Sequence, residues 1–268
     1  MTQSGVQTHQ KNRTEKRDIV NETVRINKFL SSSGYCSRRE ADRLVEEERV
    51  TIDGKIAVPG TKISFGQTVC VDGDPIQTLD KKVLIAFHKP AGIVCTTSKK
   101  EKDNIVDYIH FDSRIYPVGR LDKDSTGLIL LTNDGELTDR ILRGRNGHEK
   151  EYIVEVNQTI RPEIIDAMRQ GVPILDTMTK PCAIDILDKK RFRIVLTQGM
   201  NRQIRRMCEY FDYKVVTLKR VRILNIELGS LPEGQWRPVT PQEWEELEKS
   251  LKGQKFYNER SGADKGTD

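Results

Sequence analysis

The chain has 268 residues, of which 36% are hydrophobic and 32% charged, and its formal net charge is +5. A chain of this length can bury a core as one large domain or as two unequal ones. No apolar run approaches the ~18 residues of a membrane-spanning helix, and the polar N-terminus lacks the apolar segment of a secretory signal. We therefore expect a cytoplasmic protein without a membrane partner.

The cysteine content excludes two further classes. Five cysteines are scattered along the chain and form no Cys-x-x-Cys pair. An odd number at this spacing is typical neither of a disulfide framework nor of a zinc site. The sequence predicts reduced thiols and no metal site.

The N-terminal part predicts a small, separate unit. Residues 1–22 are polar and are expected to form a disordered tail. Residues 23–71 predict two short helices, the second capped by Ser37 with Glu40 three residues later, and then short strands with a hairpin turn at Asp53-Gly54. The basic residues on the helical side of this unit are Arg25, Lys28, Arg38, Arg39 and Arg43.

The remainder predicts a larger domain. Residues 72–82 are polar, contain proline and are interpreted as a linker. In residues 83–251, predicted strands outnumber helices and do not alternate regularly with them, which favours an α+β fold. Residues 252–268 are polar and are expected to form a second disordered tail.

The stretch "GRLDKDSTGLILLTNDG", residues 119–135, places two carboxylates, Asp122 and Asp124, just before a buried strand. Aspartates commonly stabilise turns, so both could be purely structural. However, the chain contains no phosphate-binding loop, no Gly-x-Ser-x-Gly elbow and no His-Glu-x-x-His motif. If the protein is an enzyme, a carboxylate is the best candidate for its nucleophile or base.

The basic charge is concentrated near the C-terminal end of the larger domain. Residues 191–222 contain nine basic and two acidic side chains. Within them, "NRQIRRMCEYF" predicts a helix with an apolar stripe on one face and Arg202, Arg205 and Arg206 on another. Guanidinium groups at a helix start hold phosphates or pair with a carboxylate, although an ordinary exposed basic face is the alternative.

A tyrosine in the segment "EKEYIVEV" is a further candidate. Alternation along this segment predicts a half-buried strand with Tyr152, Val154 and Val156 on one face. Taken alone, such a tyrosine is typical of a core residue with a hydrogen-bonded hydroxyl.

Three stretches in this order carry a family resemblance. G-R-L-D-x-x-x-x-G-L, then K-E-Y, then R-Q-I-R-R-M resemble the catalytic segments of the RNA pseudouridine synthases, in particular the RsuA branch. The segment "VRINKFLSSSGYCSRREADRLVEEERVTIDGK" resembles the S4 RNA-binding domain of that branch. "RLDKDS", "HEKEY" and "GVPILDTMTK" are similar to the RluF group, which acts on large-subunit rRNA. The resemblance spans residues 24–250.

The resemblance implies a fold and a set of roles. The fold is α+β, with an S4-like domain followed by a catalytic domain built on a mixed, mainly antiparallel sheet. Asp122 matches the catalytic aspartate, Tyr152 the tyrosine that stacks near the target base and moves a proton, and Arg205 the basic residue that pairs with that aspartate, while Asp124 is left to shape the loop. The residues expected to contact RNA are Arg25, Lys28, Arg38, Arg39, Arg43, Arg120, Arg202 and Arg206.

The implied reaction is the isomerisation of uridine to pseudouridine in structured RNA, which requires no cofactor and no metal. The expected partner is 23S rRNA, with a tRNA anticodon loop as a second substrate, and the expected state is a monomer. Two alternatives stay open on the residues alone. A non-catalytic RNA-binding or ribosome-assembly factor would explain the charge but not the three motifs, and a carboxylate-dependent hydrolase would need a second acid in a recognisable context.

Overall fold

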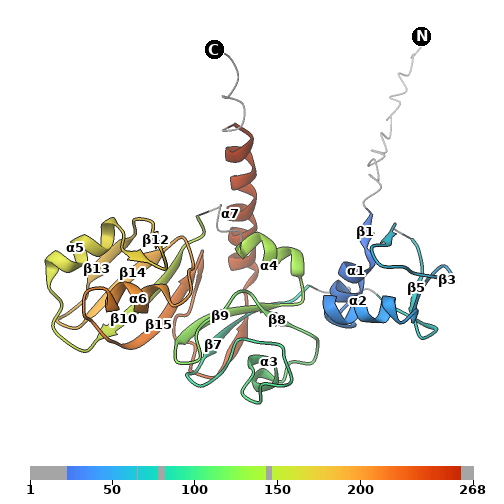
Figure 1. Ribbon diagram of the computed structural model, residues 1–268, viewed down its shortest axis with the longest axis horizontal. Coiled ribbons are helices and arrows are strands. Elements are labelled where there is room, and N and C mark those ends of the chain that lie inside the picture. Colours follow the sequence, from blue (N-terminus) through green and yellow to red (C-terminus); the bar gives the residue numbers. More distant parts are fainter. Residues whose placement is uncertain (1–22, 65, 78–81, 143–146, 261–268) are drawn as a thin grey trace, which may run out of the picture. The chain divides into compact units, whose positions relative to one another are not determined.

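The structure is a computed structural model that describes residues 23–64, 66–77, 82–142 and 147–260. The chain divides after Gln77 into a small unit and a large unit (Figure 1). The expected N-terminal tail and residues 261–268 lie outside the described residues. No helix in the described part of the chain is long and apolar enough to cross a bilayer.

The small unit packs two helices on short strands. In chain order its elements are β1 (Val24–Arg25), α1 (Ile26–Ser32), α2 (Arg38–Glu46), β2 (Val50–Ile52), β3 (Lys55–Ile56), β4 (Lys62–Ile63), β5 (Val69–Val71) and β6 (Asp74–Pro75). Strands β3, β2, β5 and β6 form one antiparallel sheet in that order, and β1 pairs with β4. Its core includes Leu30 of α1 and Ala41 of α2, both fully buried.

Local sequence signals in the small unit are confirmed. The Ser37 side chain accepts a hydrogen bond from the Glu40 backbone N–H at 3.1 Å and so caps α2. The cap is one-sided, because the Glu40 carboxylate pairs with Arg43 one turn later. Asp53 and Gly54 have φ angles of 50° and 79° and join β2 to β3, as a two-residue hairpin requires.

The small unit extends beyond its predicted end at residue 71, so the linker predicted at 72–82 was placed too early. Asp72 and Gly73 have positive φ angles and turn β5 back into β6, with Val71 opposite Asp74. Ile76 then packs against the small-unit core. The Asp-Gly pair is a hairpin turn of the same kind as Asp53-Gly54, and it continues the sheet instead of ending it.

The large unit is built on one mixed sheet. Its elements are β7 (Leu84–Lys89), α3 (Ile105–Ile109), β8 (Tyr116–Pro117), β9 (Thr126–Thr132), α4 (Gly135–Leu142), β10 (Lys150–Val156), α5 (Pro162–Gln170), β11 (Pro173–Ile174), β12 (Thr177–Met178), β13 (Ala183–Ile186), β14 (Arg191–Leu196), α6 (Gln203–Glu209), β15 (Val215–Ile223), β16 (Ile226–Glu227), β17 (Trp236–Pro238) and α7 (Pro241–Arg260). The main path runs β13-β14-β10-β15-β9-β7-β17. Only the β9–β15 contact is parallel among these pairs of described strands, which confirms the predicted α+β class.

The sheet is covered on both faces where β7 and β9 run through it (Figure 1). In β9, Leu128 and Leu130 pack in the cluster that includes α4 and α7, whereas Ile129 and Leu131 pack with α3. Successive side chains of a strand point to opposite faces, so a continuous apolar run is needed where both faces are buried. This explains why "GLILLT" carries no polar alternation.

Helix α7 is longer than the sequence predicted. Thr240 and Glu243 form a reciprocal capping box, with the Glu243 N–H donating to the Thr240 hydroxyl and the Thr240 N–H to the Glu243 carboxylate. The helix continues to Arg260, nine residues past the predicted domain end at 251. Residues 252–260 contain no proline and mostly good helix formers, and the single Gly253 does not interrupt them.

Candidate functional site

The loop between β8 and β9 forms one wall of a pocket of about 580 Å³. The pocket residues come from two loops and the start of α6: Ala91, Gly92, Val94, Cys95, Arg120, Leu121, Asp122, Lys123, Asp124 and Arg202. The Cys95 thiol is buried and accepts a hydrogen bond from the Leu121 N–H. This contact fixes the backbone immediately before Asp122.

A buried lysine holds the two loops together. Lys89 ends β7 and is fully buried. Its ammonium donates to the carbonyl oxygens of Pro90 at 2.7 Å and Ile93 at 2.8 Å, and more weakly to that of Lys123 at 3.4 Å. Burial lowers the pKa of this lysine, and the nearby Cys95, Asp124 and Asp122 oppose that shift. Sequence analysis missed Lys89, because a lysine before a proline turn carries no signal of burial.

The two carboxylates of the loop face the start of α6. Arg202 has its Nη1 atom 3.6 Å from both Asp122 Oδ2 and Asp124 Oδ1. The Arg202 backbone is left-handed, with φ of 50°, and this residue precedes the first turn of α6. The Asp122 side chain is about one-third exposed (33%). A carboxylate that is accessible and lies beside guanidinium groups can act as nucleophile or base.

Arg205 lies closer to Asp124 than to Asp122. Its Nη2 atom is 3.1 Å from Asp124 Oδ2, whereas its Nε atom is 4.0 Å from Asp122 Oδ2. The resemblance paired this arginine with the catalytic aspartate and gave Asp124 only a loop-shaping role. Helical spacing indicates which face Arg205 is on, but it does not distinguish two carboxylates that are two residues apart.

The three arginines of this helix have different surroundings. Arg205 is buried, Arg206 is half-buried and Arg202 is exposed. Arg206 donates from Nε to the Asn201 carbonyl and from Nη2 to the Asn201 side-chain oxygen, and no contact between it and either aspartate is found in the described residues. Arg120, at the pocket rim, is exposed.

Tyr152 lies near the pocket, beside a second buried arginine. It lies opposite Arg220 in the β10–β15 register, and the Arg220 guanidinium is 6.0 Å from the centre of its ring. Arg220 donates from Nε to the Leu128 carbonyl at 2.6 Å, and its Nη1 is 3.5 Å from the Arg120 carbonyl. Tyr152 also packs against the core cluster that contains Leu121. Tyr152 and Arg205 thus lie near the pocket but are not among its lining residues.

The small-unit cations are not equivalent either. Arg25, Arg38 and Arg39 are exposed, and Lys28 is partly buried. Arg43 is engaged by two acids of its own helix region, Glu40 at 2.5 Å and Glu47 at 3.7 Å. The positive charges of Arg25, Arg38 and Arg39 are therefore more available for binding than that of Arg43.

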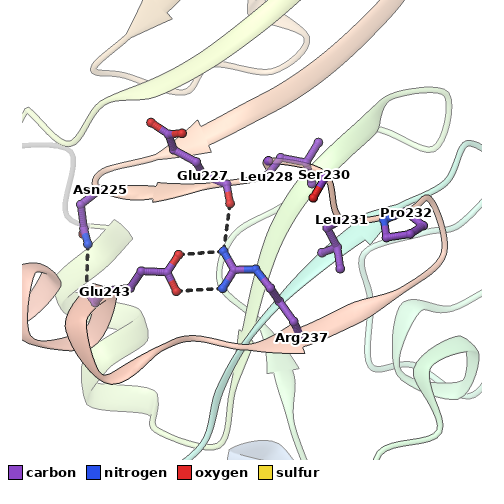
Figure 2. Close-up of a pocket in the computed structure, with 9 residues that line it drawn as sticks. Asn225, Glu227, Leu228, Ser230, Leu231, Pro232, Arg237 and Glu243 are labelled. Atoms are coloured by element: carbon purple, nitrogen blue, oxygen red, sulfur yellow. Dashed lines mark hydrogen bonds and ion pairs between the residues drawn. The ribbon is translucent and has the colours of Figure 1, made fainter.

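A second pocket lies where α7 begins (Figure 2). Arg237 makes a two-bond ion pair with the Glu243 carboxylate and also donates to the Glu227 carbonyl. Asn225 donates to the Glu243 carbonyl. These contacts fasten α7 to the sheet, and none of the predicted site residues is in this pocket.

Two family models match the chain. The model described as RNA pseudouridylate synthase covers residues 83–210, and the S4 domain model covers residues 24–69. Each match falls within one of the two structural units.

Individual relatives agree with the family models. The dual-specificity RNA pseudouridine synthase RluF of Salmonella typhi is 51% identical over 237 residues, which cover 88% of this chain and 82% of the relative. The large-subunit pseudouridine synthase B of Bacillus subtilis is 31% identical over 83% of this chain and 95% of its own. A solved pseudouridylate synthase superposes with a TM-score of 0.61 at 29% identity, covering 84% of this chain and 99% of that one. The chain therefore belongs to the RNA pseudouridine synthases, as an S4-domain member of the group that contains RluF.

Proposed function

We propose that Asp122 is the nucleophile of this enzyme and that its pocket receives a uridine of 23S rRNA, with a tRNA uridine as a second substrate. The observation that supports the role of Asp122 is its position. It is a partly exposed carboxylate in the wall of a pocket of about 580 Å³, with guanidinium groups on one side. Drug-sized and nucleobase-sized groups fit clefts of this scale.

The reaction itself needs only rearrangement. The N1–C1′ bond breaks and its electron pair stays with the uracil, the base turns over, and C5 forms a new bond to C1′. The proton on C5 leaves and N1 gains one, so the product has the same atoms and oxidation state as the substrate. Asp122, attacking either the ribose or the base, forms a covalent bond to the fragment that it attacks, and this bond breaks again when C5 has joined C1′ or as it joins it.

The surroundings of Asp122 support this role. The cationic side chains Arg202 and Arg205 lie beside the carboxylate, at 3.6 and 4.0 Å. Tyr152 lies against the cluster that contains Leu121, next to Asp122, and we propose that it stacks near the base and assists the proton transfer. Cys95, a buried residue of the pocket wall, is proposed to help retain the detached uracil.

RNA contacts are proposed for cations that are exposed or partly exposed. Extrusion of the target nucleotide costs a few kcal/mol, which phosphate contacts and stacking offset. Arg120 and Arg202 at the pocket, Arg206 beside them, and the cations of the small unit are the proposed contacts. The choice of substrate follows the printed name of the RluF relatives, which are described as dual-specificity enzymes.

The deciding experiment is Asp122→Asn assayed on unmodified transcripts of 23S rRNA and of tRNA. We expect no pseudouridine from this variant and an RNA affinity within a few-fold of wild type, because the amide keeps the size of the side chain and loses its nucleophilic charge. Turnover within tenfold of wild type would remove Asp122 from the mechanism. Pseudouridine formed by wild type in only one of the two RNAs would limit the substrate to that RNA.

We further propose that the enzyme works as a monomer in the cytoplasm. Asp122, Arg202 and Arg205 all come from one chain, so the proposed site is assembled without a second copy. Sedimentation at working concentration tests this, and a dimer mass with concentration-dependent activity would contradict it.

A further inference from the structure

Arg205 has two carboxylate neighbours and is attached to only one of them. Its Nη2 atom contacts Asp124 Oδ2 at 3.1 Å, Ser125 Oγ at 3.3 Å and the Asp124 carbonyl at 3.5 Å. The Arg205 side chain is 8% exposed, and Asp124 is 53% exposed. A buried guanidinium therefore reaches outward to a carboxylate at the protein surface.

The Nε atom on the same edge of this guanidinium lies near Asp122. The Arg205 Nε atom is buried and makes no hydrogen bond within the described part of the chain. It is 4.0 Å from Asp122 Oδ2, which is beyond hydrogen-bond length. An unsatisfied buried N–H is costly, so an Nε that lies near the proposed nucleophile without bonding it requires something else to hold the arginine in place.

We propose that Asp124 is a positioning residue, which anchors Arg205 through Nη2 and so keeps its Nε directed at Asp122 without a tight pair forming. The inference rests on the proposed role of Asp122. With Asp124 in place, the Arg205 charge is already paired at Nη2, and the Asp122 carboxylate stays free to move toward the substrate. Without Asp124, Asp122 is the remaining acidic neighbour of the buried Arg205 guanidinium. A short Arg205–Asp122 pair would then form and hold the nucleophile away from the substrate.

The direct test is Asp124→Asn, which keeps the side-chain size and removes the charge. We expect kcat to fall by about tenfold to a hundredfold, the scale for displacing a reacting group by an ångström or less. KM and RNA affinity should stay near wild type or improve slightly, since one negative charge near the RNA is lost. Asp124→Glu should restore most of kcat, because the exposed site has room for a longer carboxylate.

The matched control is Asp103→Asn. Asp103 is also an exposed aspartate, 59% exposed, and pairs with Lys123 at 3.2 Å in the same loop region, but it does not contact Arg205. It should leave kcat unchanged. An equal loss in both variants would mean that any charge change near the loop has this effect, and it would overturn the proposal.

A double-mutant cycle identifies the partner. In an Arg205→Lys background, which replaces the planar fork by a single ammonium, Asp124→Asn should cost little further rate, whereas in an Arg202→Gln background it should cost as much as in wild type. Single-turnover rates with excess enzyme, on whichever of the 23S rRNA and tRNA transcripts wild type modifies, give each corner of the cycle. Full additivity with Arg205→Lys contradicts the inference.

Failure of this inference can be told apart from failure of the proposed function. If Asp122→Asn is active, the role of Asp122 is wrong. If Asp122→Asn is inactive while Asp124→Asn keeps kcat within twofold of wild type, only the positioning role is wrong. A loss in Asp124→Asn that appears solely in RNA affinity also overturns it, because a positioning residue acts on kcat.

Discussion

Gly127 and Arg220 approach each other so closely that no side chain fits between them. They are partners in the parallel contact between β9 and β15, and a Cβ atom at Gly127 would be 2.2 Å from the Arg220 carbonyl oxygen. The φ angle of Gly127 is +105°, which L side chains rarely adopt. The glycine of the G-R-L-D-x-x-x-x-G-L motif thus allows the loop of Asp122 to enter the sheet beside the strand that carries Arg220.

Gly127→Ala should therefore destabilise the large unit and abolish activity. Backbone strain alone costs of order 1–3 kcal/mol, and separating β9 from β15 adds to it. Denaturant unfolding monitored by circular dichroism measures the loss. Gly229→Ala is the control, because Gly229 also has a positive φ but nothing within 4 Å of its added Cβ. Equal losses in the two variants would show that the close approach to Arg220 is unimportant.

Arg205→Ala should lose far more rate than Arg206→Ala. Each change removes one positive charge, so the loss of phosphate attraction is similar. Only Arg205 is buried between Asp122 and Asp124, whereas Arg206 bonds to Asn201. Removal of one partner of a fully buried ion pair costs about 3–5 kcal/mol. The loss for Arg205→Ala should be smaller, because both aspartates are partly exposed. Single-turnover rates compare the variants, and equal rate losses would mean that the helix acts only as a basic face.

Removal of residues 1–77 should weaken RNA binding and leave the large unit folded, since the two units have separate cores. The exposed cations that are lost include Arg25, Arg38 and Arg39. If these three contact phosphates, the slope of log affinity against log salt should flatten by roughly two to three units. Filter binding over a salt series measures the slope. An unchanged slope and affinity would exclude the small unit from substrate binding.

Acid should weaken the attachment of α7. The Arg237 guanidinium, bonded to Glu243, holds the pKa of that carboxyl below its usual 4.5. A carboxyl whose pKa is lower in the folded state stabilises the fold above the unfolded pKa, and this contribution is lost as pH falls through the folded value. Unfolding free energies between pH 6 and about 3 should decline less steeply for Arg237→Met than for wild type. Parallel curves would mean that this pair is not linked to folding.

The thiols should react in an order set by burial. Burial raises the pKa of Cys208 to about 12 and that of Cys182 to about 11. Because the thiolate is the reactive form, both should resist iodoacetamide at pH 8 in the native protein and react after unfolding. Mass spectrometry of the modified peptides gives the rates. The half-buried Cys70 serves as the reference, and native-state labelling of Cys208 at the rate of Cys70 would contradict the packing of α6.

Local sequence patterns predicted much of the fold, because the interactions that set them are between residues close in the chain. The cap at Ser37 and the hairpin at Asp53-Gly54 depend on a few neighbouring residues and were predicted correctly. The Asp72-Gly73 turn carried the same signal, but the polar residues around it suggested a linker. The end of α7 was also predicted wrongly, because polar helix formers resemble a disordered tail in composition.

By itself the sequence determined the family, the α+β class and the three segments that carry the candidate residues, since motifs keep their residue types and order along the chain. Only the tertiary structure decided which charges meet. Arg205 lies nearer Asp124 than Asp122, Arg206 turns to Asn201, and Lys89 and Arg220 are buried beside the pocket. Coulomb energies and hydrogen bonds depend on separations of a fraction of an ångström between segments some eighty residues apart, and such separations are fixed by how the sheet and α6 pack.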